Sequence, residues 1–407
     1  MPSPERVAVI FGGRSVEHEV SVITGHQAMD ALDVAGFAVL PIYVTKDGAW
    51  YAGRPLQNLK LYADRGVDFS RLRDVSRVSL SPDRAIRELI PSPQAGSRLF
   101  GRPPAVWADV FFPTIHGTYG EDGTLQGLFE VADVPFVGSG VVASAIAMDK
   151  VRTKALCRAA RLPVIDCISV ARDQWEAHGD GFLARVVDFC GYPAMVKPVN
   201  LGSSIGVARC SGPSALKQAI ETALVLDDRV LVERALTDFI EVNCSVMGPP
   251  IKVSVCEQVS SSAVLSFDDK YRRGAKAGRK HAVNPSAASG SRQAGKAGMA
   301  GQERLIPAPI PADLTGRVQS LAEKVFELTG ASGVARVDFL YEPRHDALYI
   351  NELNTMPGSL AFYLWEATGL PFDALVAELV AIAKARHQAK AATQFVFDAN
   401  LLAPPKP

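Results

Sequence analysis

The chain has no excess of charge of either sign, because 43 Lys and Arg residues balance 43 Asp and Glu residues. A protein without net charge has no overall field that would draw it to nucleic acid or to an anionic membrane, so we expect neither partner. It also has no C-x-x-C pair. Its six cysteines are scattered singly through segments that otherwise look like strands or helices, and we expect buried, reduced thiols.

Long apolar runs are missing too. The longest ones, such as VVASAIAM, fall far short of the ~20 residues that a membrane-spanning helix needs. The segment MPSPERVAVIFGG contains no apolar signal region. These absences favour a soluble, cytoplasmic protein. With 407 residues, 48% of them hydrophobic and 21% charged, the chain is long enough for two or three domains with ordinary apolar cores.

Strand and helix patterns alternate along the chain, which predicts an α/β architecture. The run RVAVIF predicts a strand at 6–11, and a helical pattern extends from Val16 to Leu32. The segments FAVLPIYV and ADVFFPTIHG predict further strands. We predict a first domain over residues 1–138, with an Arg-rich, irregular insertion at 53–100 that carries some helix on the outside.

Two further domains are expected. The unit 139–232 opens with a helix around MDKVRTKALCRAA and continues with the strand YPAMVKPV and a glycine-rich turn. The unit 233–387 holds four strands and ends in a long Ala/Leu/Val helix, and 388–407 form a flexible tail. Residues 272–302 carry seven Lys or Arg and no acid. Their composition alone favours a disordered loop, but their place directly after FDDKY favours a mobile lid at 266–302.

The glycine-rich turn in VKPVNLGSSIGV is a candidate phosphate site. Lys197 lies at the end of a strand, and Gly202 to Gly206 return the chain to the next strand. Backbone N–H groups and hydroxyls of such a turn can surround phosphate oxygens while the lysine adds a point charge. A glycine-rich hairpin without a ligand is an equally good interpretation. No G-K-[ST] follows, so the turn is not a Walker A loop.

Polar residues on two neighbouring strands suggest a metal site. Glu352 and Asn354 are two apart and face the same side of a strand, and an antiparallel hairpin would bring Asp338 opposite them. Three hard oxygen donors without His or Cys suit Mg²⁺ bound together with substrate phosphates. Arg336 would share this face and could stabilise developing negative charge. The alternative is a solvated polar face.

Single residues give weaker signals. Glu233 at a strand end and Glu241 beyond it could hold an adenine amino group or a ribose hydroxyl, although surface acids are the commoner case. Glu17 falls in the first turn of a helix, where the dipole favours an acid. His116 follows a strand and is either a ligand contact or a capped loop residue. Because Gly12 and Gly13 do not form G-x-G-x-x-G, a nicotinamide-dependent oxidoreductase is a distant alternative.

In order along the chain, the motifs FGGRSVEHEVS, HGTYGEDGTLQG, MDKVRTK, VKPVNLGSSIGV, FDDKY, ARVDF and NELNTMPG resemble those of the D-alanine–D-alanine ligase family, over roughly residues 6–375. The resemblance implies a three-domain ATP-grasp fold of the α/β (α+β) class with an N-terminal Rossmann-like pre-ATP-grasp domain. It implies an ATP-dependent carboxylate–amine ligase that makes D-alanyl-D-alanine through an acyl phosphate, for peptidoglycan precursors. A homodimer is also implied.

The resemblance implies a nucleotide site between the second and third domains. The residues that would contact the ATP phosphates are Lys150, Lys197 and Lys270. Those on the adenine and ribose side are Glu233, Arg234, Leu236 and Glu241. Those that would bind two Mg²⁺ ions, or Mn²⁺ in their place, are Asp338, Glu352 and Asn354.

The resemblance also implies a site for the amino acids. Glu17 would hold the ammonium group of the first D-alanine, with hydrogen bonds to Ser203 and Tyr271 fixing the lid. Arg336 and the N–H group of Gly358 would form the oxyanion site. His116 is a further candidate for substrate contact.

Three departures from the family pattern bear on the substrates. Tyr363 and Leu364 stand about where the family has a serine that helps hold the carboxylate of the second amino acid. The lid is longer than usual, and TDFIEV lacks an arginine before the ribose-binding glutamate. Tyr271, in place of a histidine, favours an amino acid as second substrate. The alternatives are a ligase of the same fold that joins other amino acids into a dipeptide metabolite, and a catalytically silent nucleotide-binding regulator.

Overall fold

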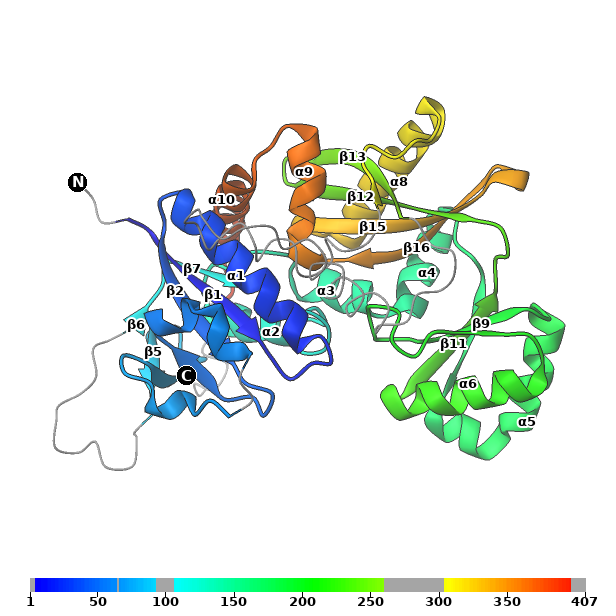
Figure 1. Ribbon diagram of the computed structural model, residues 1–407, viewed down its shortest axis with the longest axis horizontal. Coiled ribbons are helices and arrows are strands. Elements are labelled where there is room, and N and C mark those ends of the chain that lie inside the picture. The colour runs from blue at the N-terminus through cyan, green and yellow to red at the C-terminus, as the bar shows by residue number, and fades with distance from the viewer. Residues whose placement is uncertain (1–3, 64–65, 93–105, 260–303, 397–407) are drawn as a thin grey trace, which may run out of the picture.

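The computed structural model describes residues 4–63, 66–92, 106–259 and 304–396. Within these ranges the chain forms three sheets surrounded by helices (Figure 1), which confirms the expected α/β architecture. The predicted lid at 266–302, with Lys270 and Tyr271, lies outside the described residues. None of the helices within these ranges is at once long and apolar enough to cross a bilayer, and all six cysteines are free thiols.

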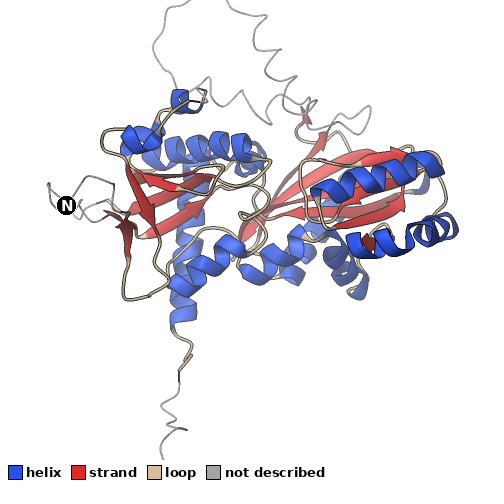
Figure 2. Cartoon of the chain, turned by 90° about the horizontal axis from the view of Figure 1, so that it is seen from below, coloured by secondary structure: helices blue, strands red, loops and turns tan. Residues whose placement is uncertain are grey.

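The first sheet has the strand order β6-β5-β4-β3-β2-β1-β7. Its centre is parallel: β1 (Arg6–Gly12) lies between β2 (Ala38–Val44) and β7 (Val110–Pro113). From Val7 to Phe11 the central strand is apolar, because both of its faces are buried there. Helix α1 (His18–Val34) packs on one face and α2 (Thr124–Ala132) on the other, and helices lie on both sides of this sheet in Figure 2.

The segment 53–100 forms part of the first sheet as well as short helices. It contains the short helices η1 (Arg54–Gln57), η2 (Leu59–Tyr62) and η3 (Phe69–Arg71). It also supplies strands β4 (Ser76–Ser79) and β5 (Glu88–Pro91), which with β3 (Trp50–Ala52) and β6 (Val106–Trp107) extend the sheet in antiparallel fashion. The expectation of an external insertion with some helix is therefore only partly right.

The second sheet has the order β10-β9-β11-β8 and is antiparallel. Its strands are β8 (Cys167–Ala171), β9 (Ala194–Pro198), β10 (Ala208–Cys210) and β11 (Arg229–Arg234). Helices α5 (Arg172–Phe189) and α6 (Pro213–Leu226) pack on it at the end of the molecule away from the first sheet (Figure 1). Two helices, α3 (Val141–Met148) and α4 (Lys150–Ala159), lead into this unit.

The third sheet has the order β14-β13-β12-β15-β16. Its strands are β12 (Ile240–Gly248), β13 (Lys252–Val259), β14 (Arg304–Leu305), β15 (Gly333–Glu342) and β16 (Ala347–Asn354). Helix α8 (Ala312–Thr329) packs against one face. A short η7 (Pro343–His345) closes the β15–β16 turn, and η8 (Gly358–Ala361) and α9 (Phe362–Thr368) follow β16.

The last helix returns to the first domain. Helix α10 (Phe372–Ala391) confirms the predicted long helix and packs beside α1 (Figure 1). Its buried Leu375 and Leu379 share one apolar cluster with Val7 and Val9 of β1. The tail expected from residue 388 is helical up to Ala391. The C-terminal helix therefore ties the third sheet to the first.

Candidate active site

A cavity opens where the loops of the first domain, the glycine-rich turn and the uncovered face of the third sheet meet. The predicted residues that line it are Glu17, His116, Lys150, Lys197, Ser203, Glu241, Arg336, Asp338, Glu352, Asn354 and Gly358. The predicted residues within the described ranges that do not line it are Glu233, Arg234, Leu236, Tyr363 and Leu364.

The β15–β16 hairpin arranges its polar residues as predicted. Asp338 pairs with Glu352, and Arg336 pairs with Asn354, in an antiparallel ladder. Directly opposite residues in such a ladder project to the same face. The sequence expectation that these four side chains share one face is therefore confirmed.

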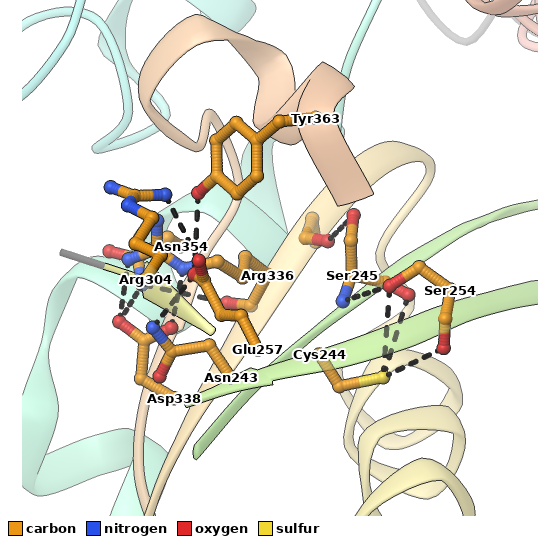
Figure 3. Close-up of polar contacts among 11 residues, drawn as sticks. Asn243, Cys244, Ser245, Ser254, Glu257, Arg304, Arg336, Asp338, Asn354 and Tyr363 are labelled. Carbon is orange, nitrogen blue, oxygen red and sulfur yellow. Dashed lines mark hydrogen bonds and ion pairs between the residues drawn. The ribbon is translucent and has the colours of Figure 1, made fainter. Parts of the chain in front are cut away.

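Arg336 and Asp338 form a buried two-pronged pair (Figure 3). The arginine Nε donates to Oδ1 at 2.6 Å and Nη2 donates to Oδ2 at 2.7 Å, while Asn354 Nδ2 donates to Oδ2 at 3.0 Å. Burial alone would lower the pKa of Arg336, but Asp338 raises that pKa well above its usual value. In the described part of the chain, the buried Nη1 has no hydrogen-bond partner. The pair thus fixes a charged guanidinium with one donor unused.

The oxygen donors of the hairpin fit Mg²⁺ only in part. Within the described residues, no three His, Cys, Asp or Glu side chains gather to hold an ion. Asp338, Glu352 and the amide of Asn354 offer two carboxylates and one neutral oxygen. This hard, incomplete set suits a cation that completes its shell with phosphate oxygens and water.

The cation of Lys150 is placed by a helix end. The side chain of Asp149 caps α4 by accepting from the N–H of Arg152 at 2.8 Å, and it pairs with Arg229 at 2.8 Å. Lys150 is the first helical residue, and its Nζ donates to the carbonyl of Leu201 at 2.5 Å and lies 3.6 Å from Glu352. Helix α4, the glycine-rich turn and the β15–β16 hairpin therefore meet at this lysine.

Lys197 belongs to a buried cluster of charged residues, of which the sequence analysis predicted Lys197 and Glu233 as site residues but not Lys154. Glu233 lies 2.6 Å from Lys197 and 2.8 Å from Lys154, while Lys197 also donates to Asn351 at 2.9 Å. Burial alone would raise the pKa of Glu233, but the two lysines lower it. Two cations around one anion leave a net positive charge. Lys154 was missed, although it follows Lys150 by one helical turn in MDKVRTK.

Glu17 lies at the junction of two glycine loops. It is 6% exposed and accepts a hydrogen bond from Ser203, as expected from the sequence. A Cβ atom on Gly117, whose φ is +72°, would lie 2.6 Å from the carboxylate. Only glycine allows this close approach. The loop after β7 and the glycine-rich turn therefore close on one carboxylate.

Two buried titratable groups join the first domain to the loop after β16. His116 Nε2 lies 2.9 Å from Thr24 Oγ1, and burial lowers its pKa to about 4. Glu121 accepts from the N–H of Gly117 at 2.7 Å and from that of Met356 at 3.0 Å. Burial, and then Glu17, raise the pKa of Glu121. Glu121 was missed although it lies within the quoted motif HGTYGEDG.

The turn after Gly358 is strained. Ser359, Leu360 and Ala361 have φ values of 54°, 54° and 50°, in the left-handed region that non-glycine residues avoid. All three are buried, and the N–H of Ser359 donates to Thr24 at 3.2 Å. Such strain persists where surrounding structure enforces it, often at functional sites.

The remaining predicted residues do not line the cavity, and Arg234 among them is exposed. Arg234 pairs with Glu342 at 3.2 Å, and Leu236 and Leu364 are buried. The hydroxyl of Tyr363 donates to Glu257 at 3.3 Å (Figure 3). Glu257 and its partner Arg304 were not predicted, and only Arg304 of these two lines the cavity.

The chain is similar over nearly its whole length to one family of proteins. A family model described as D-ala D-ala ligase N-terminus matches residues 6–139, and one described as D-ala D-ala ligase C-terminus matches residues 156–294 and 293–381. The chain is 37% identical over 395 residues to a D-alanine–D-alanine ligase of Heliobacterium modesticaldum, which covers 95% of this chain and 96% of the relative.

Solved structures share the arrangement of the whole chain. The D-alanine-D-alanine ligase from Coxiella burnetii superposes with a TM-score of 0.72 at 26% identity, covering 96% of each chain. The VanG D-Ala:D-Ser ligase from Enterococcus faecalis gives a TM-score of 0.72 at 28% identity, covering 93% of this chain and 99% of that chain.

Proposed function

This chain belongs to the D-alanine–D-alanine ligase family, and we propose that its cavity joins two D-alanine molecules at the expense of ATP, for peptidoglycan precursor synthesis. It is an ATP-dependent ligase with the ATP-grasp fold. The assignment of the site rests on the buried Arg336–Asp338 pair. This pair leaves the Nη1 atom of a charged guanidinium without a hydrogen-bond partner among the described residues, beside the hairpin carboxylates.

The nucleotide phosphates lie, in this proposal, along Lys150 and Lys197. The cluster of Lys197, Lys154 and Glu233 keeps one positive charge in excess, which favours a phosphate group at this end. Glu233, Arg234, Leu236 and Glu241 are assigned to the adenine and ribose side by family resemblance, and of these four only Glu241 lines the cavity. Lys270, outside the described residues, is assigned to the γ-phosphate by family resemblance alone.

In the first step, the carboxylate of one D-alanine attacks the γ-phosphorus of ATP, giving an acyl phosphate and ADP. Glu17, held by Ser203, pairs with the ammonium group of this D-alanine and orients it. Arg336 stabilises the charge that passes between oxygens, through the donor that has no partner among the described residues.

In the second step, the amine of the other D-alanine attacks the acyl phosphate carbonyl. The tetrahedral oxyanion is stabilised by Arg336 and the N–H of Gly358, and it collapses by expelling phosphate. The attacking ammonium group loses one proton to solvent before attack, and its nitrogen loses a second, which passes to the departing phosphate. Enclosure of the cavity matters here, because water would hydrolyse the acyl phosphate.

Divalent metal use follows from the family, and we propose two Mg²⁺ ions held by Asp338, Glu352 and Asn354, with Mn²⁺ able to take their place. Such an ion neutralises the phosphate oxygens and strengthens the electrophile. The proposal also includes a cytoplasmic location and a homodimer, the latter measurable by light scattering of the purified chain.

The decisive experiment measures phosphate release from ATP with single D- and L-amino acids and with pairs, together with the dipeptide formed. Phosphate release with D-alanine alone, dependent on Mg²⁺ and accompanied by D-alanyl-D-alanine, is expected. Nucleotide binding without amino-acid-dependent release would instead indicate a silent regulator. Release only with another pair would reassign the substrates and keep the chemistry.

A second acceptor is worth including in the panel. One structural relative is described as a D-Ala:D-Ser ligase, and Tyr363 stands where this chain departs from the family pattern. Formation of D-alanyl-D-serine in preference to D-alanyl-D-alanine would make D-serine the acceptor.

A further inference from the structure

Polar residues cross the third sheet in one row, from the metal-binding end of the cavity to its far side. Glu352, Asp338, Asn243 and Glu257 are paired in turn on β16, β15, β12 and β13. Opposite residues in antiparallel pairs share a face, so the four side chains point the same way. With strands about 4.8 Å apart, Glu257 lies roughly 10 Å from Asp338.

A second guanidinium ends this row. Arg304 on β14 pairs with Val259, two residues beyond Glu257 and therefore on the same face. Its Nη1 donates to Glu257 at 3.1 Å, and its side chain is 7% exposed while that of Glu257 is fully buried. The aromatic ring of Tyr363 lies beside the guanidinium in Figure 3, and its centroid is 4.4 Å from Arg304 Cζ.

Glu257 and Tyr363 position Arg304 rather than face the cavity. Glu257 accepts hydrogen bonds from Asn243 at 3.1 Å and from Tyr363 at 3.3 Å, as well as from Arg304. Its negative charge is thus shared among three donors. Of Arg304, Glu257 and Tyr363, only Arg304 lines the cavity. The contacts with Glu257 and Tyr363 on its other side therefore fix the orientation of its guanidinium group.

Charges of both signs line the cavity, and the acids among the described residues are Glu17, Glu121, Glu241, Asp338 and Glu352. Among the described residues, the lysines and arginines that line it are Lys150, Lys197, Arg304 and Arg336. The lysines border the nucleotide side, and Arg336 is assigned to the reacting oxygens. The acids Glu17 and Glu121 lie at the first-domain end. Arg304 is the lining cation that the two reaction steps leave without a role.

We propose that Arg304, positioned by Glu257 and Tyr363, binds the carboxylate of the second amino acid and so makes this chain select acceptors that carry a carboxylate. The inference rests on the proposed ligase function. A guanidinium fork suits a carboxylate because it can donate two parallel hydrogen bonds. It projects from the same sheet face as Arg336 and lines the same cavity, and we place the acceptor's amine toward Arg336 and its carboxylate at Arg304.

The test is a competition between D-alanine and D-alaninamide as acceptors, with D-alanine also serving as donor. D-Alaninamide has no carboxylate, so it can act only as an acceptor. The measured quantity is the ratio of D-alanyl-D-alanine to D-alanyl-D-alaninamide by mass spectrometry. Because both products share the first step, effects on ATP or on the donor cancel in this ratio.

The variants separate recognition from packing. Arg304→Met alone would leave the buried Glu257 unpaired and could unfold the chain, so the main variant is Arg304→Met combined with Glu257→Gln. We expect it to lower the product ratio about 10- to 100-fold, the effect of losing one charge-assisted contact. Glu257→Gln alone keeps the arginine and an accepting amide oxygen beside it, so it should lower the ratio much less than the double variant does. Arg317→Met, an exposed arginine paired with Asp346, is the matched control.

An unchanged ratio in the double variant would overturn the inference and leave Arg304 as a partner of Glu257 only. A loss of equal size in Glu257→Gln alone would also overturn it, since the effect would then not require removal of the arginine. If the unaltered chain makes neither dipeptide, the proposed function fails first, and that outcome is recognisable without any variant.

Discussion

At the scale of the residue, we predict the effect of Lys154→Met from the excess positive charge that Lys154 and Lys197 leave around Glu233. Without Lys154, the carboxylate of Glu233 is shared with Lys197 alone, and the pair becomes neutral. The positive charge offered to ATP phosphates then falls. We expect the KM for ATP to rise about 10- to 100-fold with a smaller change in kcat, as for one lost charge-assisted contact.

The exposed Lys217 on α6 provides the matched control, since Lys217→Met should leave the KM for ATP unchanged. Binding of adenosine, which has no phosphate, separates this effect from damage to the adenine side. Equal losses of affinity for adenosine and ATP would contradict the electrostatic role of Lys154.

His116 predicts a pH dependence of stability. Its pKa falls from about 6.5 in an unfolded chain to about 4, because burial penalises the charged ring. Between these values the unfolded state binds a proton that the folded state does not, so stability falls as pH drops through this window. The expected loss between pH 7 and pH 5 is about 2 kcal/mol.

Urea unfolding of the unaltered chain and of His116→Gln at both pH values measures this contribution. Glutamine does not titrate, so the variant should lose about 2 kcal/mol less than the unaltered chain on acidification. The raised pKa of Glu121 works in the opposite direction, and because its carboxylate lies 3.9 Å from His116 Nδ1, the difference between the two proteins reports His116 together with its effect on Glu121. Identical pH dependences would show that His116 does not titrate in this window.

At the scale of the element, sequence patterns predicted the strands that have long apolar runs or clear partners. The run RVAVIF and the β15–β16 hairpin are of this kind, because burial of both faces or a two-residue repeat leaves a visible signature. Strands β4 and β5 have no such signature in the sequence, because each buries a single residue, Val78 in β4 and Leu89 in β5.

The residues missed in the site are those whose partners lie on other elements. Glu257 and Arg304 belong to different strands, and 46 intervening positions separate them in the sequence. No local periodicity relates them, because their contact depends on sheet order. Motifs identified Asp338, Glu352 and Arg336 because these follow one another in a single hairpin.

The start of helix α4 carries the element-scale prediction. Asp149 caps it and pairs with Arg229, so Asp149→Ala should destabilise the chain by about 2 kcal/mol and loosen the first residue, Lys150. We expect a higher KM for ATP along with the lower melting temperature. Asp68→Ala removes the exposed cap of η3, far from the site, and should leave the KM for ATP unchanged. A normal KM for ATP in Asp149→Ala would show that the cap stabilises the helix without orienting Lys150.

At the scale of the whole molecule, the substrates would bind between parts that α10 holds together. The first domain supplies Glu17 and His116, and the third sheet supplies the β15–β16 hairpin. Arg386 of α10 donates to the carbonyls of Gly138 and Phe136, the latter at 2.9 Å. The geometry between the two sheets therefore depends on packing remote from the chemistry.

Leu379→Ala tests this dependence. Leu379 is fully buried in the apolar cluster that joins α10 to β1, and its truncation leaves a cavity that should cost about 2–5 kcal/mol. The exposed Val225 gives the control, since Val225→Ala should stay within about 0.5 kcal/mol of the unaltered chain. Because α10 fixes the first sheet, whereas ATP is assigned to the second and third sheets, the KM for D-alanine should rise more than the KM for ATP. A stability loss with both KM values unchanged would mean that α10 stabilises the fold without setting the distance between the parts of the site.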